Sequence, residues 1–142
     1  MDRSCCYSIA DKGAEPYVEN MELVAAYNTN FRTAIWTGCH LQMTLMSIPA
    51  CGEIGQEIHQ DTDQYIRVEQ GYAVVSMGAN KNRMDVVQNM RRGDAVFVPA
   101  GTWHNIVNAG RMPLKLSSIY APPHHPKGTV HRTKEDAERA EY

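Results

Sequence analysis

The sequence predicts an all-β domain made of many short strands. Between residues 31 and 120, short segments rich in β-branched and aromatic side chains follow one another closely. Glycine and proline separate many of these segments, which is typical of a sandwich or barrel and not of alternating strands and helices. With 142 residues, the chain has the length of one domain with its own hydrophobic core.

The first 30 residues are predicted to form an arm and a short helix. Residues 1–15 carry few core signals and are expected to be irregular or extended, and residues 16–18 favour a short strand. Asn20 is a suitable N-cap for a helix over residues 21–27. Since the strand has no partner nearby in the sequence, we expect it to pair with the sheet edge of its own domain or of a second subunit.

The β domain spans residues 31–122 and contains all the other predicted strands. They lie at residues 31–36, 41–48, 54–59, 65–68, 72–77, 84–88, 95–98, 104–107 and 114–120. Polar or glycine-containing turns, such as residues 60–63 and 78–82, join neighbouring strands. The tail, residues 123–142, is predicted to be irregular until Thr133, whose spacing to Asp136 resembles a capping box that opens a final short helix.

Composition and charge exclude several classes of partner. The net charge is −2 and the pI is near 6.3, so neither nucleic acid nor an anionic membrane is an expected partner. No apolar stretch approaches the roughly 20 residues that a membrane span needs. The N-terminus lacks the apolar core of a secretory signal. The cysteines, which have no C-x-x-C spacing, are expected to be reduced in a cytoplasmic protein; they are Cys5, Cys6, Cys39 and Cys51.

The segment from Gly93 to Asn108 has the spacing Gly-x5-Pro-x-Gly-x2-His-x3-Asn. Pro99 cannot donate to a strand ladder and Gly101 permits a positive φ, so a sharp turn is expected between two strands. His104 begins the second strand and is therefore expected at the mouth of whatever the strands enclose. The spacing matches the second signature of the cupin family at every fixed position, and the chain resembles that family.

Cupins carry a first signature, Gly-x5-His-x-His-x3,4-Glu-x6-Gly, upstream of the second. Counting back from Gly71 places Gln64 where the Glu usually stands and His59 where the second His stands. Glu57 occupies the position of the first His, and the leading glycine is displaced by about one place, to Gly52. The chain therefore resembles this signature with two substitutions among the usual metal ligands.

The spacing of these residues also supports a metal site without the resemblance. Glu57 and His59 share one face of a strand, and a tight turn can place Gln64 opposite them. His104 can add a ligand from the other side. Two imidazole nitrogens and two oxygens without a thiolate suit one divalent transition metal, namely zinc, manganese, iron, nickel or cobalt. Each residue alone has a simpler interpretation as a packed or surface polar side chain, and some cupins bind no metal.

The resemblance implies a double-stranded β-helix, the jelly-roll barrel of the cupins, with short helices near both ends. It also implies a homodimer, because small cupins often pair and the N-terminal arm is long enough to reach a second barrel. The expected partner is a small-molecule substrate, with no nucleic acid and no membrane. The residues that bind this substrate stay open.

Tyr120 and His131 are the candidates for a catalytic acid or base. Along residues 114–120, Tyr120 is in phase with the core leucines, so its hydroxyl can reach the pocket. His124, His125 and His131 follow the last predicted strand of the β domain, and one of them can fold over the barrel mouth. A solvated tail is the simpler expectation for these three histidines.

The resemblance of the ligand set to those of other cupins implies a metal-dependent enzyme that acts on a small carbohydrate-like molecule as an isomerase, epimerase or lyase. The set resembles the oxygen-rich sites of sugar-phosphate isomerase cupins and of cupins that act on uronates, although the full Gln-x-His-x-His-Arg-x-Glu-x-Trp string of mannose-phosphate isomerases is missing. A first alternative is a non-haem iron dioxygenase, because Glu57, His59 and His104 make two histidines and one carboxylate. A second is a non-catalytic cupin that binds a metal or a small metabolite.

Overall fold

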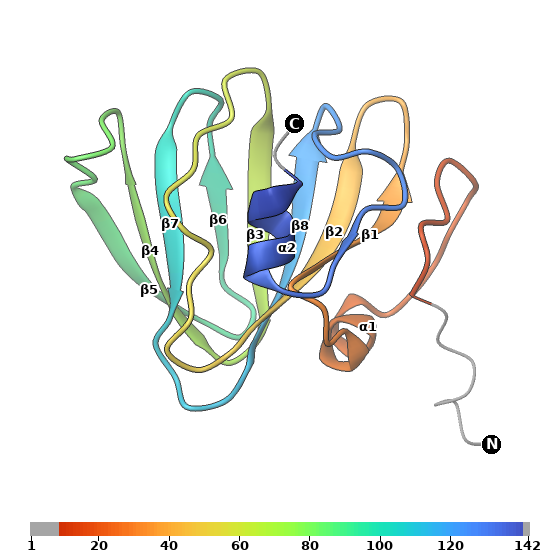
Figure 1. The fold of residues 1–142 in the computed structure, drawn as a ribbon, viewed down its shortest axis with the longest axis horizontal. Helices are drawn as coiled ribbons and strands as arrows, with labels where there is room; N and C mark the ends of the chain where they lie inside the picture. The colour runs from red at the N-terminus through yellow and green to blue at the C-terminus, as the bar shows by residue number, and fades with distance from the viewer. Residues whose placement is uncertain (1–8, 141–142) are drawn as a thin grey trace.

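The computed structural model describes residues 9–140 as two antiparallel β-sheets with two short helices (Figure 1). The strands are β1 Arg32–Thr37, β2 Gln42–Ile48, β3 Asp63–Gln70, β4 Tyr72–Gly78, β5 Val86–Arg91, β6 Ala95–Val98, β7 Trp103–Asn108, β8 Leu114–Ala121 and β9 Val130–His131. The helices are α1 Met21–Tyr27 and α2 Lys134–Arg139. The six-stranded sheet has the order β6-β3-β8-β2-β1-β9, and the three-stranded sheet has the order β5-β4-β7. The predicted all-β fold class is confirmed.

The chain crosses between the two sheets several times. β3 lies in the large sheet, β4 and β5 in the small sheet, β6 again in the large one, β7 in the small one and β8 in the large one. β8 lies between β2 and β3 and pairs with both, so that Leu116 is opposite Met46 on one side and Val68 on the other. Winding of this kind between two facing sheets is the pattern of a double-stranded β-helix.

The hydrophobic core lies between the two sheets. Ile66 and Val68 of β3 and Leu116 of β8 come from the large sheet, and Val75 and Ile106 come from the small one. All five side chains are at most 1% exposed. Because successive side chains of a strand point to opposite faces, Ile66 and Val68, two positions apart on β3, enter this layer together. Buried polar side chains, including His59, Gln64 and His104, lie inside the domain in addition to this apolar core.

Both predicted helices form, and both begin at the predicted caps. The side chain of Asn20 accepts a hydrogen bond from the backbone N–H of Leu23, 3.0 Å away, at the start of α1. α1 buries Val24 and Ala25 in a second apolar cluster with the large sheet. Thr133 caps α2 by accepting from the N–H of Asp136 at 3.1 Å.

Four predicted elements differ from the structure. Residues 16–18 form no strand. Residues 54–59 run alongside β7 with only isolated bridges, because Gly55 interrupts the extended backbone with a φ of 102°. The strand predicted at 84–88 is shifted to β5, and β9 adds a strand inside the predicted irregular tail. The predictions for residues 1–8, including Cys5 and Cys6, lie outside the described part of the chain.

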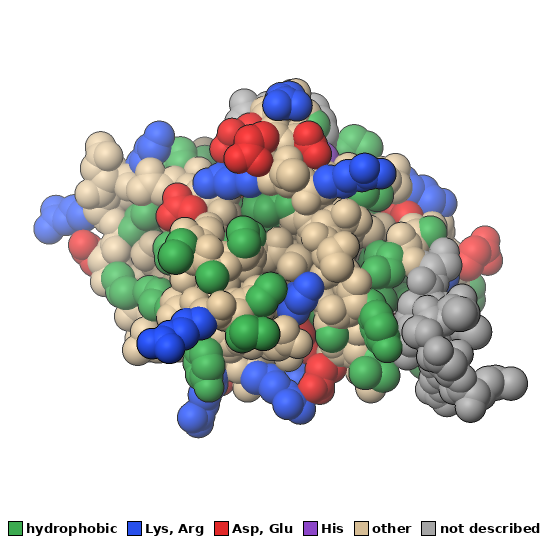
Figure 2. All heavy atoms as spheres, turned by 60° about the horizontal axis from the view of Figure 1, so that its bottom comes forward, with side chains coloured by type: hydrophobic (Ala, Val, Ile, Leu, Met, Phe, Trp, Pro, Cys, Tyr) green, Lys and Arg blue, Asp and Glu red, His purple; other side chains and the backbone are tan. Residues whose placement is uncertain are grey.

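The surface mixes charged and apolar side chains. Figure 2 shows hydrophobic side chains scattered among lysines and arginines on one face, with acidic side chains gathered over the projecting α2 at the top of the view. Cys39 and Cys51 are free and exposed. No helix within residues 9–140 is long and apolar enough to cross a membrane.

Candidate metal centre

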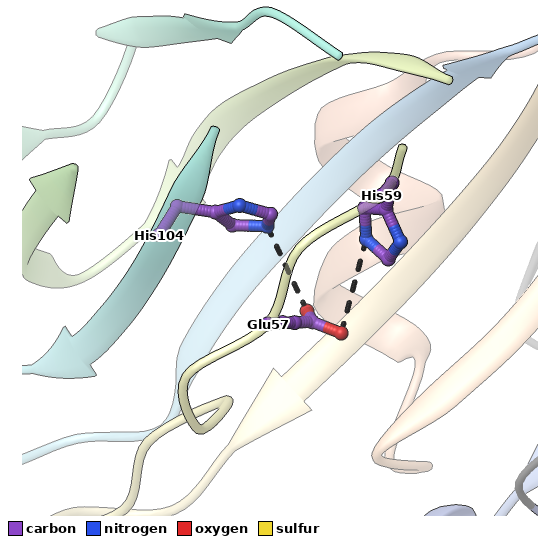
Figure 3. A group of neighbouring side chains, drawn as sticks. All are labelled: Glu57, His59 and His104. Carbon is purple, nitrogen blue, oxygen red and sulfur yellow. Dashed lines mark ion pairs between the residues drawn. The ribbon is translucent and has the colours of Figure 1, made fainter. Parts of the chain in front are cut away.

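Glu57 and His104 are brought together by a short antiparallel bridge. The backbone N–H of each residue donates to the carbonyl of the other, with both N···O distances at 3.0 Å. Residues directly opposite each other in such a bridge place their side chains on the same face. His59 follows Glu57 by two positions and points to the same place (Figure 3).

The turn between β6 and β7 links the backbone before His104 to that of His59. Pro99 ends the strand, and Gly101 has a φ of 78°, a conformation that glycine adopts without steric cost. The N–H of Gly101 donates to the carbonyl of His59 at 2.8 Å. This hydrogen bond ties the turn that leads into His104 directly to the backbone of the second histidine.

A backbone carbonyl fixes the tautomer of His104. Nδ1 of its ring lies 3.0 Å from the carbonyl oxygen of Thr102. Because a carbonyl oxygen only accepts hydrogen bonds, Nδ1 carries the proton and Nε2 keeps its lone pair. The Nε2 atom, which faces Glu57, is therefore the atom that can bind a cation.

The three side chains form a cluster of metal-ligand size. Nε2 of His59 lies 3.8 Å from one carboxylate oxygen of Glu57, and Nε2 of His104 lies 3.9 Å from the other. The possible ligand atoms of all three residues lie within 4.8 Å of one another. These gaps are too long for hydrogen bonds, but two ligands bound at about 2.1 Å to one ion are roughly 3–4 Å apart.

The two histidine Nε2 atoms fit a cation rather than a protein partner. Both atoms are buried, and neither has a hydrogen-bond partner among residues 9–140. A buried polar atom without a partner is costly, so a ligand at this point would relieve that cost. The donor set of two imidazoles and one carboxylate is one that divalent transition metals accept.

Burial sets the charge of the cluster. It lowers the pKa of His59 to about 3, and His124, His104 and Arg32 add to the effect, so His59 is neutral at pH 7. Burial also raises the pKa of Glu57, against the opposing influence of Arg32 and His104, although 26% of the Glu57 side chain is exposed. A divalent cation bound here would favour the ionised carboxylate.

Gln64 reaches the site from β3 in the large sheet, and not across a hairpin from Glu57 and His59. β3 pairs with β6 and β8, so the expected antiparallel return beside residues 57–59 is wrong. Gln64 is opposite Tyr120 in the ladder, so both side chains share one face, and the Tyr120 ring lies 5.6 Å from that of His59.

The Gln64 amide is held in one orientation. Its Nε2 donates to Oγ of Ser118 at 2.9 Å, while its buried Oε1 has no partner within the described chain. The amide oxygen is therefore the atom that remains for a ligand.

Tyr120 lies inside the barrel beside the cluster. Its side chain is fully buried, and its hydroxyl lies near Ser118 and Arg32 without a well-formed hydrogen bond to any residue of 9–140. Burial raises the pKa of Tyr120, so the phenol stays protonated at neutral pH. The structure thus brings this sequence-predicted residue next to the candidate ligands.

The histidines after β8 pack toward the site, although His124 itself is exposed, so the expectation of a solvated tail is wrong for His125 and His131. The His124 ring lies 4.3 Å from that of His59, and the His125 ring lies 5.0 Å from that of Tyr120. The buried Gln42 side chain holds this segment: its Oε1 accepts from the N–H groups of His124 and His125, and its Nε2 donates to the His125 carbonyl. His131 is buried in β9.

Arg32 is a site residue that sequence reasoning missed. It begins β1, is only 5% exposed, and lines the same cavity of about 950 Å³ as Glu57, His59, His124, His125 and His131. Its Nη1 lies 3.3 Å from Nδ1 of His131, its neighbour across the β1–β9 ladder. No local motif marks Arg32, because its neighbours in the site lie far away in the sequence.

Comparison with known proteins agrees with this architecture. Residues 44–120 match the cupin domain family. YrkC of Bacillus subtilis (strain 168) is 51% identical over 133 residues, which make up 94% of this chain and 72% of YrkC. The crystal structure of BH2720 from Bacillus halodurans, 50% identical, superposes with a TM-score of 0.91 over 92% of this chain and 99% of that one. KdgF from a Halomonas species, 18% identical, shares the fold with a TM-score of 0.59 over 66% of this chain and 80% of KdgF.

The family match spans more than half of the chain, and both signature segments lie at the site where the two sheets bring their polar residues together. The chain therefore belongs to the cupin family.

Proposed function

We propose that Glu57, His59, Gln64 and His104 bind one divalent transition metal, and that the protein is an enzyme acting on a small carbohydrate-like molecule. Zinc, manganese, iron, nickel and cobalt all suit this ligand set. The observation that carries the proposal is the pair of buried histidine Nε2 atoms, without partners among residues 9–140, that face the carboxylate of Glu57, a residue of the cavity wall. The proposed reaction is an isomerisation, epimerisation or elimination.

The chain supplies a proton donor for such a reaction. A bound metal would polarise a carbonyl or hydroxyl oxygen of the substrate. Tyr120, protonated because burial raises its pKa, is placed to donate to an oxygen atom near His59. Arg32 only donates, so Nδ1 of His131 accepts and the neutral His131 ring carries its proton on Nε2. His131 would therefore enter the chemistry as a donor and not as a base.

Metal content tests this proposal. Protein purified without chelator or affinity metal would be compared by mass spectrometry with His59→Ala, His104→Ala and, as a matched control, His40→Ala on the exposed surface. We expect about one ion per chain in the wild type and the control, and its loss in both site variants with the circular dichroism spectrum preserved. Absence of metal in the wild type, even after reconstitution, would overturn the proposal.

The metal-loaded protein would then be incubated with sugar phosphates and uronates while NMR follows substrate conversion. An oxygen-dependent reaction is the second candidate, because Glu57, His59 and His104 form the two-histidine, one-carboxylate set of non-haem iron oxygenases. Oxygen uptake by the Fe(II)-loaded protein, with no isomerised product, would favour this candidate. Full metal occupancy without turnover of either kind would favour a non-catalytic binder.

A further inference from the structure

Arg32 is a buried arginine without a carboxylate partner. Only 5% of its surface is exposed, and it forms no ion pair with any Asp or Glu of residues 9–140. Its Nε atom is buried and has no hydrogen-bond partner in the described part of the chain. Arginine is rarely buried unless it is paired, and an uncompensated buried charge is costly. A ligand that brings a negative charge to this point would remove the cost.

The groups around Arg32 do not neutralise it. The His124, His125 and His131 rings share its cavity, and their pKa values are lowered by burial and by Arg32, so they are neutral at pH 7. Glu53 at the cavity wall pairs with Lys134 at 3.9 Å. Glu57 is close enough for Arg32 to lower its pKa but lies beyond ion-pair distance, and its oxygen atoms face the two histidines.

His131 orients the guanidinium group. Its Nδ1 accepts from Nη1 of Arg32 across the β1–β9 ladder, which fixes one corner of the planar group. The Nε–H lies on another edge of the planar group and has no hydrogen-bond partner within residues 9–140, and the neutral Tyr120 phenol beside Arg32 brings no negative charge to it. Two parallel N–H groups on one guanidinium edge match the two oxygen atoms of a carboxylate. His131 is thus a positioning residue for Arg32.

We infer that Arg32 binds the carboxylate of the substrate, while another oxygen of the same molecule reaches the Glu57, His59 and His104 cluster. The substrate class is then a small hydroxy or keto acid of the uronate type. This inference rests on the proposed function for the second contact but not for the first, because the unpaired Arg32 exists whether or not a metal binds.

The test compares charged and neutral ligands of the same shape. Zn²⁺-reconstituted protein would be titrated with D-galacturonate, D-galactose and D-galactose 6-phosphate, and with the smaller pair glycolate and glycolamide. The ¹⁵N–¹H signal of Arg32 Nε would report contact directly. The variants are Arg32→Gln and Arg32→Lys, with Arg83→Gln as a matched control, because Arg83 is exposed and forms an ion pair with the exposed Asp85.

In the wild type and in Arg83→Gln we expect each carboxylate to bind about tenfold or more tightly than its neutral counterpart and to shift the Arg32 Nε signal. Arg32→Gln should lose this preference, and Arg32→Lys should keep part of it, since a lysine retains the charge but not the planar fork. Metal content should stay at the wild-type level in both variants.

Three results would overturn the inference: equal affinity for the charged and neutral members of each pair, a preference that survives in Arg32→Gln, or tighter binding of the sugar phosphate than of the uronate. The same titration on metal-free protein separates the two proposals. If the chain takes up no metal, the metal site is refuted. If the carboxylate preference nevertheless persists and still depends on Arg32, the anion site stands without it.

Discussion

At the scale of single residues, the candidate site depends on which atoms are left unpaired by their neighbours. The Thr102 carbonyl accepts a hydrogen bond from Nδ1 of His104, and Oγ of Ser118 accepts one from the amide nitrogen of Gln64. In both cases the remaining atom, Nε2 or Oε1, is buried without a partner in the described chain. Hydrogen bonds outside a ligand set commonly orient its members in this way.

Gln64 is a proposed ligand whose role can be tested by substitution. If its Oε1 binds the metal, Gln64→Leu should weaken metal affinity by about 10- to 100-fold, because the substitution removes the oxygen and leaves a side chain of similar size. Gln64→Glu should restore or strengthen binding, since a carboxylate is a stronger ligand than an amide. Competition with a chromogenic chelator measures both effects.

Gln60→Leu, on the exposed turn before β3, is the matched control and should leave metal affinity unchanged. An affinity for Gln64→Leu equal to that of the wild type would show that the metal has only the other three ligands.

At the scale of elements, Asn108 ties the end of β7 to its surroundings. This residue closes the second signature, yet its side chain acts on the backbone: Nδ2 donates to the carbonyls of Ile48 and Met112, and Oδ1 accepts from the N–H of Gly110. The side chain is buried, at 4% exposure. Its contacts join the last residue of β2 to the loop between β7 and β8.

Asn108→Ala should therefore lower the free energy of unfolding by about 2 kcal/mol without loss of metal, because buried backbone groups would lose their partners. Urea denaturation and metal content would be measured on the same samples. Asn89→Ala, on the exposed face of β5, is the matched control and should change stability by no more than about 0.5 kcal/mol. Loss of metal from well-folded Asn108→Ala would contradict a purely structural role.

At the scale of the whole molecule, the buried histidines make stability depend on pH. Burial, with help from nearby charges, lowers the pKa of His59 to about 3 and that of His125 to about 2, from an ordinary value of 6.5. Below pH 6.5 the unfolded chain thus binds more protons than the folded one, and folding becomes less favourable as pH falls. Each such histidine contributes up to about 1.4 kcal/mol per pH unit.

Metal-free protein should accordingly unfold at a lower temperature at pH 5 than at pH 7. The raised pKa of Glu57 acts in the opposite direction, but it is one group against several histidines. Thermal unfolding followed by circular dichroism measures the dependence, and His125→Gln should make it shallower. A midpoint that stays constant or rises towards pH 5 would refute this account.

We also expect the molecule to be a homodimer. Val18, in the arm before α1, is 96% exposed, and Val87 is 57% exposed on β5 at the edge of the small sheet. Light scattering should give about twice the chain mass of 15.9 kDa. Val18→Asp and Val87→Asp would show whether the arm or the sheet edge makes the contact, and a wild-type mass of one chain would contradict the expectation.

Local patterns were sufficient to predict part of the site. The turn at Pro99 and Gly101, the position of His104, and the shared direction of Glu57 and His59 follow from strand geometry and spacing over a few residues. The caps of α1 and α2 were predictable for the same reason. Residues 54–59 were wrongly predicted as a regular strand, because the effect of Gly55 depends on its conformation and not on its identity alone.

The sequence by itself determined the all-β class, the two signature segments and the shared direction of Glu57 and His59, while the bridge that brings His104 to Glu57 is seen only in the folded chain. Only the tertiary structure placed Arg32 beside His131, 99 positions away, and folded His124 onto His59. It also brought Gln64 in from the large sheet and not from a hairpin. Hydrophobic periodicity within a segment shows which face is buried but not which distant strand it will pair with. The neighbours of Arg32 and Gln64 are therefore decided only when the two sheets assemble.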